Sequence, residues 1–271
     1  MFSTKGSGVN NSSTRVVNER RGNILLLTLD GAETRNAIGP DVYPVLQAHI
    51  VNAEQDPEIG AIILTGANGY FSSGGNVNAL KASGASTLAA ATGNTDKLNA
   101  LILSIAQSSK PIIAAVEGGA AGAGFSLCLA CDMIVASEDA RFTAAYVRVG
   151  LSPDGGATHF LTRALPRQLV NEICMLGRPV AALRLYAAGL INSCYPAGGA
   201  IDASLELASE IAAGPPNAMR KIKELICIAG SSDLPAQLAI EARAINLARF
   251  GDEAAEGLSA FVEKRKANFQ R

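Results

Sequence analysis

Residues 110–136, KPIIAAVEGGAAGAGFSLCLACDMIVA, place two short apolar runs on either side of a glycine-rich loop and a small helix-forming segment. Pro111–Val116 and Asp132–Ala136 predict buried strands, because each is a compact apolar run bounded by polar or turn residues. Glu117–Gly124 predicts a loop, and Phe125–Cys131 predicts a helix that begins directly after it. A strand, a small-residue loop, a helix and another strand in this order predict an α/β protein.

The same alternation extends outward from this stretch in both directions. Ile24–Leu29 and Ile59–Thr65 predict two more strands, and the second lacks polar alternation, as expected for a strand buried on both faces. Helices are predicted over Asp41–Asp56 and Asp96–Ser109, and residues 81–95 predict a mobile surface segment or a weak helix. Beyond Leu165 the apolar spacing becomes mostly helical. The fold class is therefore an α/β core followed by C-terminal helices.

The composition excludes several classes of protein. The chain has 271 residues, 48% hydrophobic and 17% charged, with a formal net charge of −1. A disordered chain and a nucleic-acid-binding surface are both disfavoured by these values. Residues 1–14 are polar and predict a disordered tail without the apolar segment of a signal peptide, and no run predicts a membrane span. We expect a cytoplasmic protein, with an organellar transit peptide as the alternative.

The five cysteines predict neither a disulfide framework nor a metal centre. Cys128 and Cys131 form a CxxC motif, but no second CxxC or neighbouring histidine completes a zinc site. Their flanks are apolar, so we expect buried, unreactive thiols. No metal is predicted.

Two glycine-rich loops are the candidate ligand-binding segments. Residues 70–76 follow the strand Ile59–Thr65, and residues 117–124 follow Pro111–Val116. Loops at the carboxyl ends of strands bind ligands in α/β proteins, and a helix that starts in the second loop favours an anion or oxyanion. The glycine order is not that of a dinucleotide fingerprint, and no Walker sequence occurs. Close packing of strand on helix is the alternative explanation for either loop alone.

These motifs, taken with three others, resemble the enoyl-CoA hydratase/isomerase (crotonase) superfamily from about Arg15 to Gln270. The stretches that carry the resemblance are Arg35–Ile38 (RNAI), Phe71–Asn76 (FSSGGN), Lys110–Asp132, Gly150–Gly156 (GLSPDGG) and Glu256–Arg265 (EGLSAFVEKR). The resemblance implies a crotonase-like spiral of ββα turns over residues 15–200. It implies a C-terminal helical region over 201–271 that assembles trimers, often paired into hexamers.

The resemblance also implies an acyl-CoA thioester as substrate, with no further cofactor because coenzyme A is part of that substrate. By position, the backbone N–H groups of Gly75 and Ala123 would bind the thioester oxygen. Preorganised donors of this kind are worth most in a site that excludes water.

Contacts to coenzyme A are implied at two places in the chain. One set comprises the backbone around Arg35, Asn36 and Ala37, together with Ser73. The other comprises Phe261 and Lys264, which match positions that reach the coenzyme A of a neighbouring subunit. An ordinary helix face is the alternative interpretation of Phe261 and Lys264.

The chain departs from the family pattern at the two glutamates that hydratases use to add water. Ser126 and Tyr146 occupy those positions, and neither supplies carboxylate chemistry at neutral pH. One carboxylate remains, Asp154, within a motif whose aspartate is catalytic in isomerase and dehalogenase branches. The segments around it look most like the ring-epoxyphenylacetyl-CoA isomerase branch. A helix N-cap is the structural alternative for Asp154.

We therefore predict an acyl-CoA isomerase in which Asp154 is the lone acid/base and Ser126 and Tyr146 line the substrate pocket. The substrate would undergo a double-bond shift or a ring-epoxide rearrangement. A hydratase with non-standard residues and a catalytically idle homologue that binds CoA esters are the alternatives. The dehalogenase and Ser-His-Asp hydrolase interpretations lack their histidine and serine motifs, although His159 is close enough in sequence to support Asp154.

Overall fold

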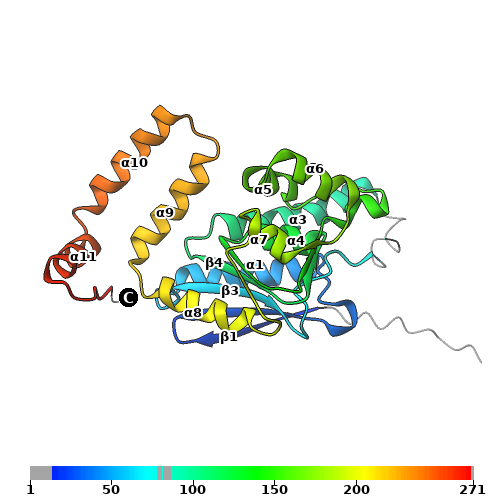
Figure 1. The fold of residues 1–271 in the computed structure, drawn as a ribbon, viewed down its shortest axis with the longest axis horizontal. Coiled ribbons are helices and arrows are strands. Elements are labelled where there is room, and N and C mark those ends of the chain that lie inside the picture. Colours follow the sequence, from blue (N-terminus) through cyan, green and yellow to red (C-terminus); the bar gives the residue numbers. More distant parts are fainter. Residues whose placement is uncertain (1–13, 78–80, 82–86, 270–271) are drawn as a thin grey trace, which may run out of the picture.

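The computed structural model describes residues 14–77, 81 and 87–269, which form two sheets with helices on both faces of the larger one (Figure 1). The strands of the large sheet lie in the order β1-β2-β3-β4-β6-β9. They comprise β1 (Arg15–Arg21), β2 (Ile24–Asp30), β3 (Ala61–Gly66), β4 (Ile112–Val116), β6 (Met133–Ser137) and β9 (Ser193–Tyr195). The small sheet comprises β5 (Gly119–Ala121), β7 (Arg141–Thr143) and β8 (Val180–Ala181). The predicted α/β class is confirmed.

The large sheet is parallel from β2 to β9, and only β1 runs antiparallel to its neighbour. Leu26 is paired with Ile63, and Ile63 with Ile113, so the apolar strands align side by side. Strand β1 was not predicted, because its residues RVVNERR are polar and mostly exposed. This pattern is typical of an edge strand, whose charged side chains discourage pairing with another chain.

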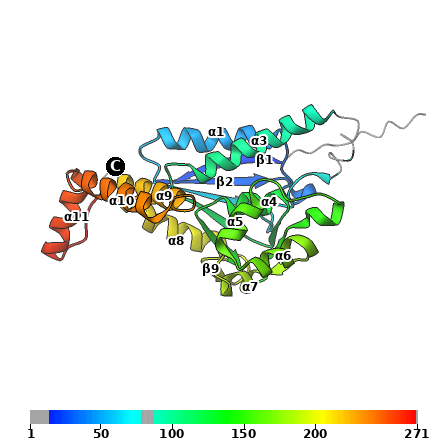
Figure 2. The same cartoon turned by 90° about the horizontal axis from the view of Figure 1, so that it is seen from above.

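Strand β3 is buried on both faces, as predicted, and its side chains alternate between two apolar clusters. Ile62 and Leu64 face the layer that contains α1 (Val42–Gln55) and α3 (Leu88–Ala106). Ala61 and Ile63 face α8 (Ala200–Ala212) on the opposite side. Figure 2 shows these helices on the two faces of the sheet. The sheet is therefore the middle of three layers.

The remaining helices are shorter or lie outside these layers. They comprise α4 (Ala123–Leu129), α5 (Ala157–Ala164), α6 (Arg167–Leu176), α7 (Ala182–Ala187), α9 (Pro216–Ala229), α10 (Leu234–Ala248) and α11 (Asp252–Glu263), with the 3-10 turns η1 (Ala32–Thr34) and η3 (Ala145–Val149). Two strands that alternate between the sheets, followed by a helix, form one ββα turn, as in β4, β5 and α4.

Two predicted boundaries at the surface need correction. Helix α3 begins at Leu88 and not at Asp96, because Thr87 caps it by accepting from the Ala90 N–H and three alanines follow Leu88. The predicted tail 1–14 lies outside the described residues except for Thr14, which is buried and donates its hydroxyl to the Ala37 carbonyl. Within residues 81–95, predicted as a mobile surface segment or a weak helix, residues 82–86 lie outside the described residues and residues 88–95 are helical.

The CxxC thiols are buried, as predicted. Cys128 and Cys131 lie at the end of α4 and just after it, and burial raises the pKa of both thiols. The Cys131 thiol donates to the Leu127 carbonyl. In the described part of the chain, no three His, Cys, Asp or Glu side chains gather as a metal site would require.

Helices α9, α10 and α11 extend away from the sheet layers (Figure 1). Their surface carries large exposed apolar side chains, among them Ile226, Phe250 and Val262. Apolar surface of this extent is typical of a contact with another chain. Among the described residues, no helix has the length and hydropathy needed to cross a membrane.

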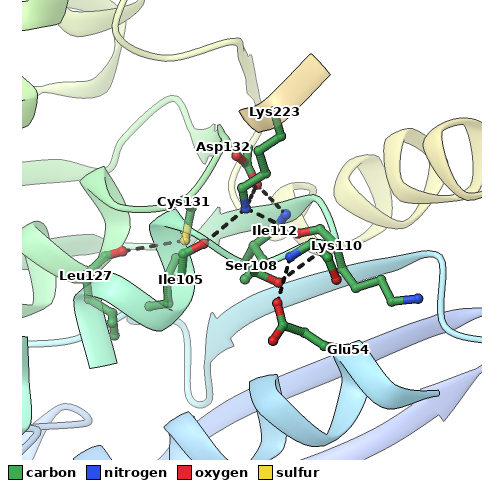
Figure 3. Close-up of polar contacts among 10 residues, drawn as sticks. Glu54, Ile105, Ser108, Lys110, Ile112, Leu127, Cys131, Asp132 and Lys223 are labelled. Atoms are coloured by element: carbon green, nitrogen blue, oxygen red, sulfur yellow. Dashed lines mark hydrogen bonds and ion pairs between the residues drawn. The ribbon is translucent and has the colours of Figure 1, made fainter. Parts of the chain in front are cut away.

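Lys223 of α9 anchors this helical arm to the core (Figure 3). Its ammonium donates to the Ile105 and Lys110 carbonyls at 3.0 and 3.2 Å, and to the Asp132 carboxylate at 2.8 Å. The same Asp132 oxygen accepts from the Ile112 N–H at 2.7 Å. The pair is mostly shielded from water, with 11% of the Lys223 side chain and 25% of the Asp132 side chain exposed.

Replacing Lys223 by methionine tests this anchor. Burial raises the pKa of Asp132, and the Lys223 charge opposes that rise, so the ionised carboxylate depends on its partner. We expect Lys223→Met to lose about 2 kcal/mol of unfolding free energy at pH 7, between the values for exposed and buried pairs. The loss should shrink as pH falls through the Asp132 pKa, because the protonated carboxyl no longer needs the cation.

The control is Lys221→Met, which removes a more exposed lysine two residues away on α9 whose ammonium donates to Glu224. Its cost should stay below about 0.5 kcal/mol. Equal losses for the two variants in urea unfolding, or a Lys223→Met loss that does not change with pH, would contradict the anchor.

Candidate active site

The two glycine-rich loops predicted from the sequence lie against each other at the carboxyl ends of β3 and β4. Ser72 and Ala120 form a parallel bridge, and the Ala121 N–H donates to the Ser72 carbonyl at 2.9 Å. Ser72 is fully buried at this junction. Neighbouring parallel strands bring their carboxyl ends to one edge of the sheet, so the meeting follows from the strand order.

Gly74 makes the closest approach between the loops. Its backbone has φ +85°, and a Cβ there would lie 2.3 Å from the Ala121 carbonyl oxygen and 3.0 Å from the Ala123 nitrogen. The Ser72 hydroxyl accepts from the Gly74 N–H at 3.1 Å and holds it in place. Only glycine fits this position, and Gly74 consequently lies beside the backbone nitrogen of Ala123.

Ala123 is the first residue of α4, so its N–H precedes the hydrogen bonds within that helix. Gly122, the N-cap, supplies no side-chain acceptor. A Cβ on Gly124 would lie 2.7 Å from Ser72, so small residues let the helix start press against the first loop. The structure thus brings Gly75 and Ala123 to adjacent backbone segments, and their role as an oxyanion pair stays a prediction.

The turn that holds Arg35, Asn36 and Ala37 lies beside the first loop. The Arg35 carbonyl accepts from the Ser73 N–H at 2.9 Å, and the Ser73 hydroxyl donates to the Thr34 carbonyl at 2.7 Å. Arg35 and Asn36 both adopt positive φ, at 51° and 58°. The four residues predicted to contact coenzyme A near this loop are therefore gathered in one place.

The Asn36 side chain joins this turn to the first loop. The amide is buried, accepts from the Gly31 N–H at 2.9 Å and donates to the Ala67 and Tyr70 carbonyls at 2.9 and 2.6 Å. The Arg35 guanidinium lies over the Tyr70 ring, 5.6 Å from its centre. The Asn36 backbone is hydrogen-bonded as well, since its N–H donates to the Gly31 carbonyl at 2.9 Å and its carbonyl accepts from the Ser72 hydroxyl at 2.8 Å. Asn36 therefore joins the two segments with both its side chain and its backbone, and the predicted contact with coenzyme A stays a prediction.

Ser126, Tyr146 and Asp154 form one hydrogen-bonded cluster. The Tyr146 hydroxyl donates to Asp154 Oδ1 at 2.7 Å, and the Ser126 hydroxyl lies 2.9 Å from both the Tyr146 hydroxyl and the Asp154 carbonyl oxygen. Burial, together with the Asp154 charge, raises the pKa of Tyr146, so its hydroxyl stays protonated. Asp154 is partly buried in this cluster.

The turn after Asp154 explains how it reaches α4. Gly155 has φ +57°, and a Cβ there would lie 2.9 Å from that of Ser126, so glycine lets the turn lie directly on the helix. Ser126 follows Ala123 by three residues, a rise of about 4.5 Å along the helix. The N-cap alternative for Asp154 is wrong, because Gly156 occupies the N-cap of α5 and no side chain caps it.

Tyr43 and His159 differ in their relation to Asp154. Tyr43, on the buried face of α1, was missed by the sequence analysis; burial and the Asp154 and Asp41 charges raise its pKa, which indicates that it lies near Asp154. The signal available was a polar-tipped aromatic on an apolar helix face. His159 is exposed and its Nδ1 lies 2.8 Å from Arg163, so the structure provides no basis for its predicted support of Asp154.

Phe261 and Lys264 lie on α11 and at its end, outside the sheet layers. The Phe261 side chain is exposed, and Lys264 ends the helix in a left-handed conformation with φ +54°. The fold does not bring these residues to the loop cluster of their own chain. Their predicted contact with a neighbouring subunit's coenzyme A stays a prediction.

Comparison with known proteins identifies the class. Residues 19–271 match the family described as Enoyl-CoA hydratase/isomerase. The chain is 32% identical to the 2,3-dehydroadipyl-CoA hydratase of Escherichia coli, over 95% of this chain and 99% of that protein. It is 33% identical to enoyl-CoA hydratase EchA19 of Mycobacterium tuberculosis, over 93% and 95% of the two chains.

A solved structure described as an enoyl-CoA hydratase from Polaromonas sp. JS666 has a TM-score of 0.93 and 41% identity, over 94% of this chain and 99% of that one. The chain therefore belongs to the enoyl-CoA hydratase/isomerase family, and the crotonase-like fold predicted from the motifs is confirmed.

The close approach at Gly74 can be tested by stability alone. Gly74→Ala adds both left-handed strain and a collision with the Ala121 carbonyl, and we expect a loss of about 3 kcal/mol. Gly69→Ala is the matched control, since Gly69 has φ +68° but open space where a Cβ would stand. Strain alone should cost about 1 kcal/mol there. Similar losses for both variants in chemical unfolding would show that the loops are not in tight contact.

Proposed function

We propose that this chain is an acyl-CoA isomerase that moves a double bond through a thioester enolate, with Asp154 as the only acid/base. The observation that carries the proposal is the contact of Asp154 with α4, where its backbone carbonyl accepts from Ser126, three residues after the first residue of the helix. Tyr146 occupies Oδ1 of that carboxylate, while Oδ2 accepts no hydrogen bond from the described part of the chain. Oδ2 is therefore the oxygen that is left to exchange a proton with substrate.

In the proposed reaction, Asp154 Oδ2 removes a proton from the carbon at one end of the three-carbon unit. The C–H electron pair moves into a dienolate, and the negative charge rests on the thioester oxygen between the N–H groups of Gly75 and Ala123. Asp154 then returns the proton to the carbon at the other end. One group that acts first as base and then as acid is sufficient, because no atom is added or lost.

Hydration is the second candidate, and the names of the relatives support it, since both curated relatives described above are called hydratases. Addition of water needs a base for the water and an acid for the carbon. Ser126 carries a hydroxyl group, and the hydroxyl of Tyr146 stays protonated, so neither residue supplies the base that hydration needs. This favours isomerisation over hydration. The sequence resembles the ring-epoxyphenylacetyl-CoA isomerase branch, and a ring-epoxide substrate therefore stays a further prediction.

The assembly is also part of the proposal. The exposed apolar side chains of α9–α11 support a homotrimer or homohexamer, in which Phe261 and Lys264 would reach the site of a neighbour. Sedimentation analysis tests this directly. An acyl-CoA thioester is the proposed partner, with no separate cofactor, no nucleic acid and no membrane, and a cytoplasmic location is proposed.

The test of function is mass spectrometry with chromatography on matched 3-enoyl-CoA and 2-enoyl-CoA. We expect interconversion at unchanged mass, and Asp154→Asn should slow it about 100- to 10,000-fold, the contribution of a general acid/base. The substitution keeps the shape of the side chain, so thermal unfolding should change little.

Asp139→Asn is the control, because Asp139 is an exposed carboxylate in the turn between β6 and β7. It should leave the rate unchanged. A product whose mass has increased by one water molecule would indicate a hydratase instead of an isomerase. Binding of CoA esters without any turnover would indicate a catalytically idle homologue. Full activity of folded Asp154→Asn would remove Asp154 from its role.

A further inference from the structure

The cluster of Ser126, Tyr146 and Asp154 contains fewer hydroxyl protons than close contacts between oxygen atoms. Ser126 and Tyr146 each carry one hydroxyl proton, whereas the oxygens form three close contacts at 2.7–2.9 Å. The shortest of them joins the Tyr146 hydroxyl to the carboxylate, the strongest acceptor present. The Tyr146 proton therefore points at Asp154 Oδ1, and the Ser126 proton serves the Asp154 carbonyl or the Tyr146 oxygen.

This arrangement persists when Asp154 takes up a proton at Oδ2. Oδ1 then becomes the carbonyl-like oxygen of a carboxylic acid, which still accepts a hydrogen bond. A proton on Oδ1 would instead point at the Tyr146 oxygen, whose own proton would then turn to the Ser126 oxygen, 2.9 Å away. Such a proton would lie between the two oxygens of the Tyr146–Asp154 contact, so it is not the proton that Oδ2 exchanges with substrate.

We infer that Tyr146 is a positioning residue that reserves Asp154 Oδ1, so that Oδ2 alone carries the migrating proton in both halves of the reaction. This inference rests on the proposed isomerase function and deepens it. The carbon that loses the proton and the carbon that regains it must both face Oδ2. The transferred proton then stays next to the dienolate, since Oδ1 is closed to the water that would otherwise exchange with it.

Two parts of the fold keep the hydroxyl in place. Tyr146 belongs to η3, which packs on α6, while Ser126 is fixed in the first turn of α4. Gly155 brings the Asp154 backbone onto Ser126. The carboxylate is thus held through its backbone by one hydroxyl and through its side chain by the other, which leaves one free oxygen and a fixed orientation.

The experiment measures turnover in D2O, comparing wild type with Tyr146→Phe, Ser126→Ala and the control Tyr186→Phe. For wild type we expect an isomerised product with little solvent deuterium. For Tyr146→Phe we expect kcat to fall about tenfold, the scale of one hydrogen bond to a charged group, with KM nearly unchanged. Deuterium in the product should rise several-fold, because freed Oδ1 admits water.

Ser126→Ala separates positioning from packing. It keeps the Tyr146–Asp154 hydrogen bond, so its product should carry as little deuterium as that of wild type, even where its rate is reduced. Tyr186 lies exposed on α7, and Tyr186→Phe should match wild type in every readout.

The possible outcomes distinguish this inference from the proposed function. Tyr146→Phe with wild-type kcat and deuterium content would overturn the inference while the isomerase remains. An equal deuterium rise in Ser126→Ala would also overturn it, because loosening of the cluster would then be the cause. A wild-type enzyme that isomerises no enoyl-CoA would instead overturn the proposed function. If Tyr146→Phe did not fold, wild-type product fully labelled from D2O would still contradict a proton held on Oδ2.

Discussion

The close contact between the loops after β3 and β4 is the constraint on which the site depends. At Gly74 the two backbones approach so closely that a single methyl group would lie 2.3 Å from a carbonyl oxygen. That contact places Gly74, the residue before Gly75, against the first residue of α4. Everything proposed for the chemistry follows from it, because two N–H groups on separate loops can serve one oxygen only when the loops cannot drift apart.

The second part of the site is ordered by the same helix. Ala123 starts α4 and Ser126 follows three residues later, so the proposed charge-binding end and the hydroxyl that holds the Asp154 backbone share a rigid element. Rigid elements hold such groups more accurately than loops do. The Asp154 turn is the part that comes from elsewhere in the chain, and Gly155 is what lets it lie on α4.

Much of the fold could be predicted from the sequence, because buried parallel strands are short apolar runs and the glycine loops stand directly after them. β1 could not be predicted in this way, since an exposed edge strand has no apolar face. The start of α3 at Leu88 depended on the Thr87 cap in a segment of small residues that also suits a loop. In these places tertiary context or a single hydrogen bond decides the structure.

The candidate site, like the fold, could be predicted only in part from the sequence. The residues of both loops and Asp154 were predicted by motif, and their gathering agrees with the strand order. The bond between Tyr146 and Asp154 was not predicted, because it depends on the path of η3 and on the glycine turn after Asp154. Tyr43 was missed for a similar reason, since its place near Asp154 follows from the packing of α1.

The most direct test of the central claim is a crystal structure of the protein with an enoyl-CoA bound to Asp154→Asn. We predict that the thioester oxygen lies about 3 Å from the backbone nitrogens of both Gly75 and Ala123, the geometry of an oxyanion site. We also expect the side chain of residue 154 to face the carbons of the acyl chain that lie beyond the thioester group. A thioester oxygen bound by other groups, or an acyl chain that leaves the two loops untouched, would contradict it.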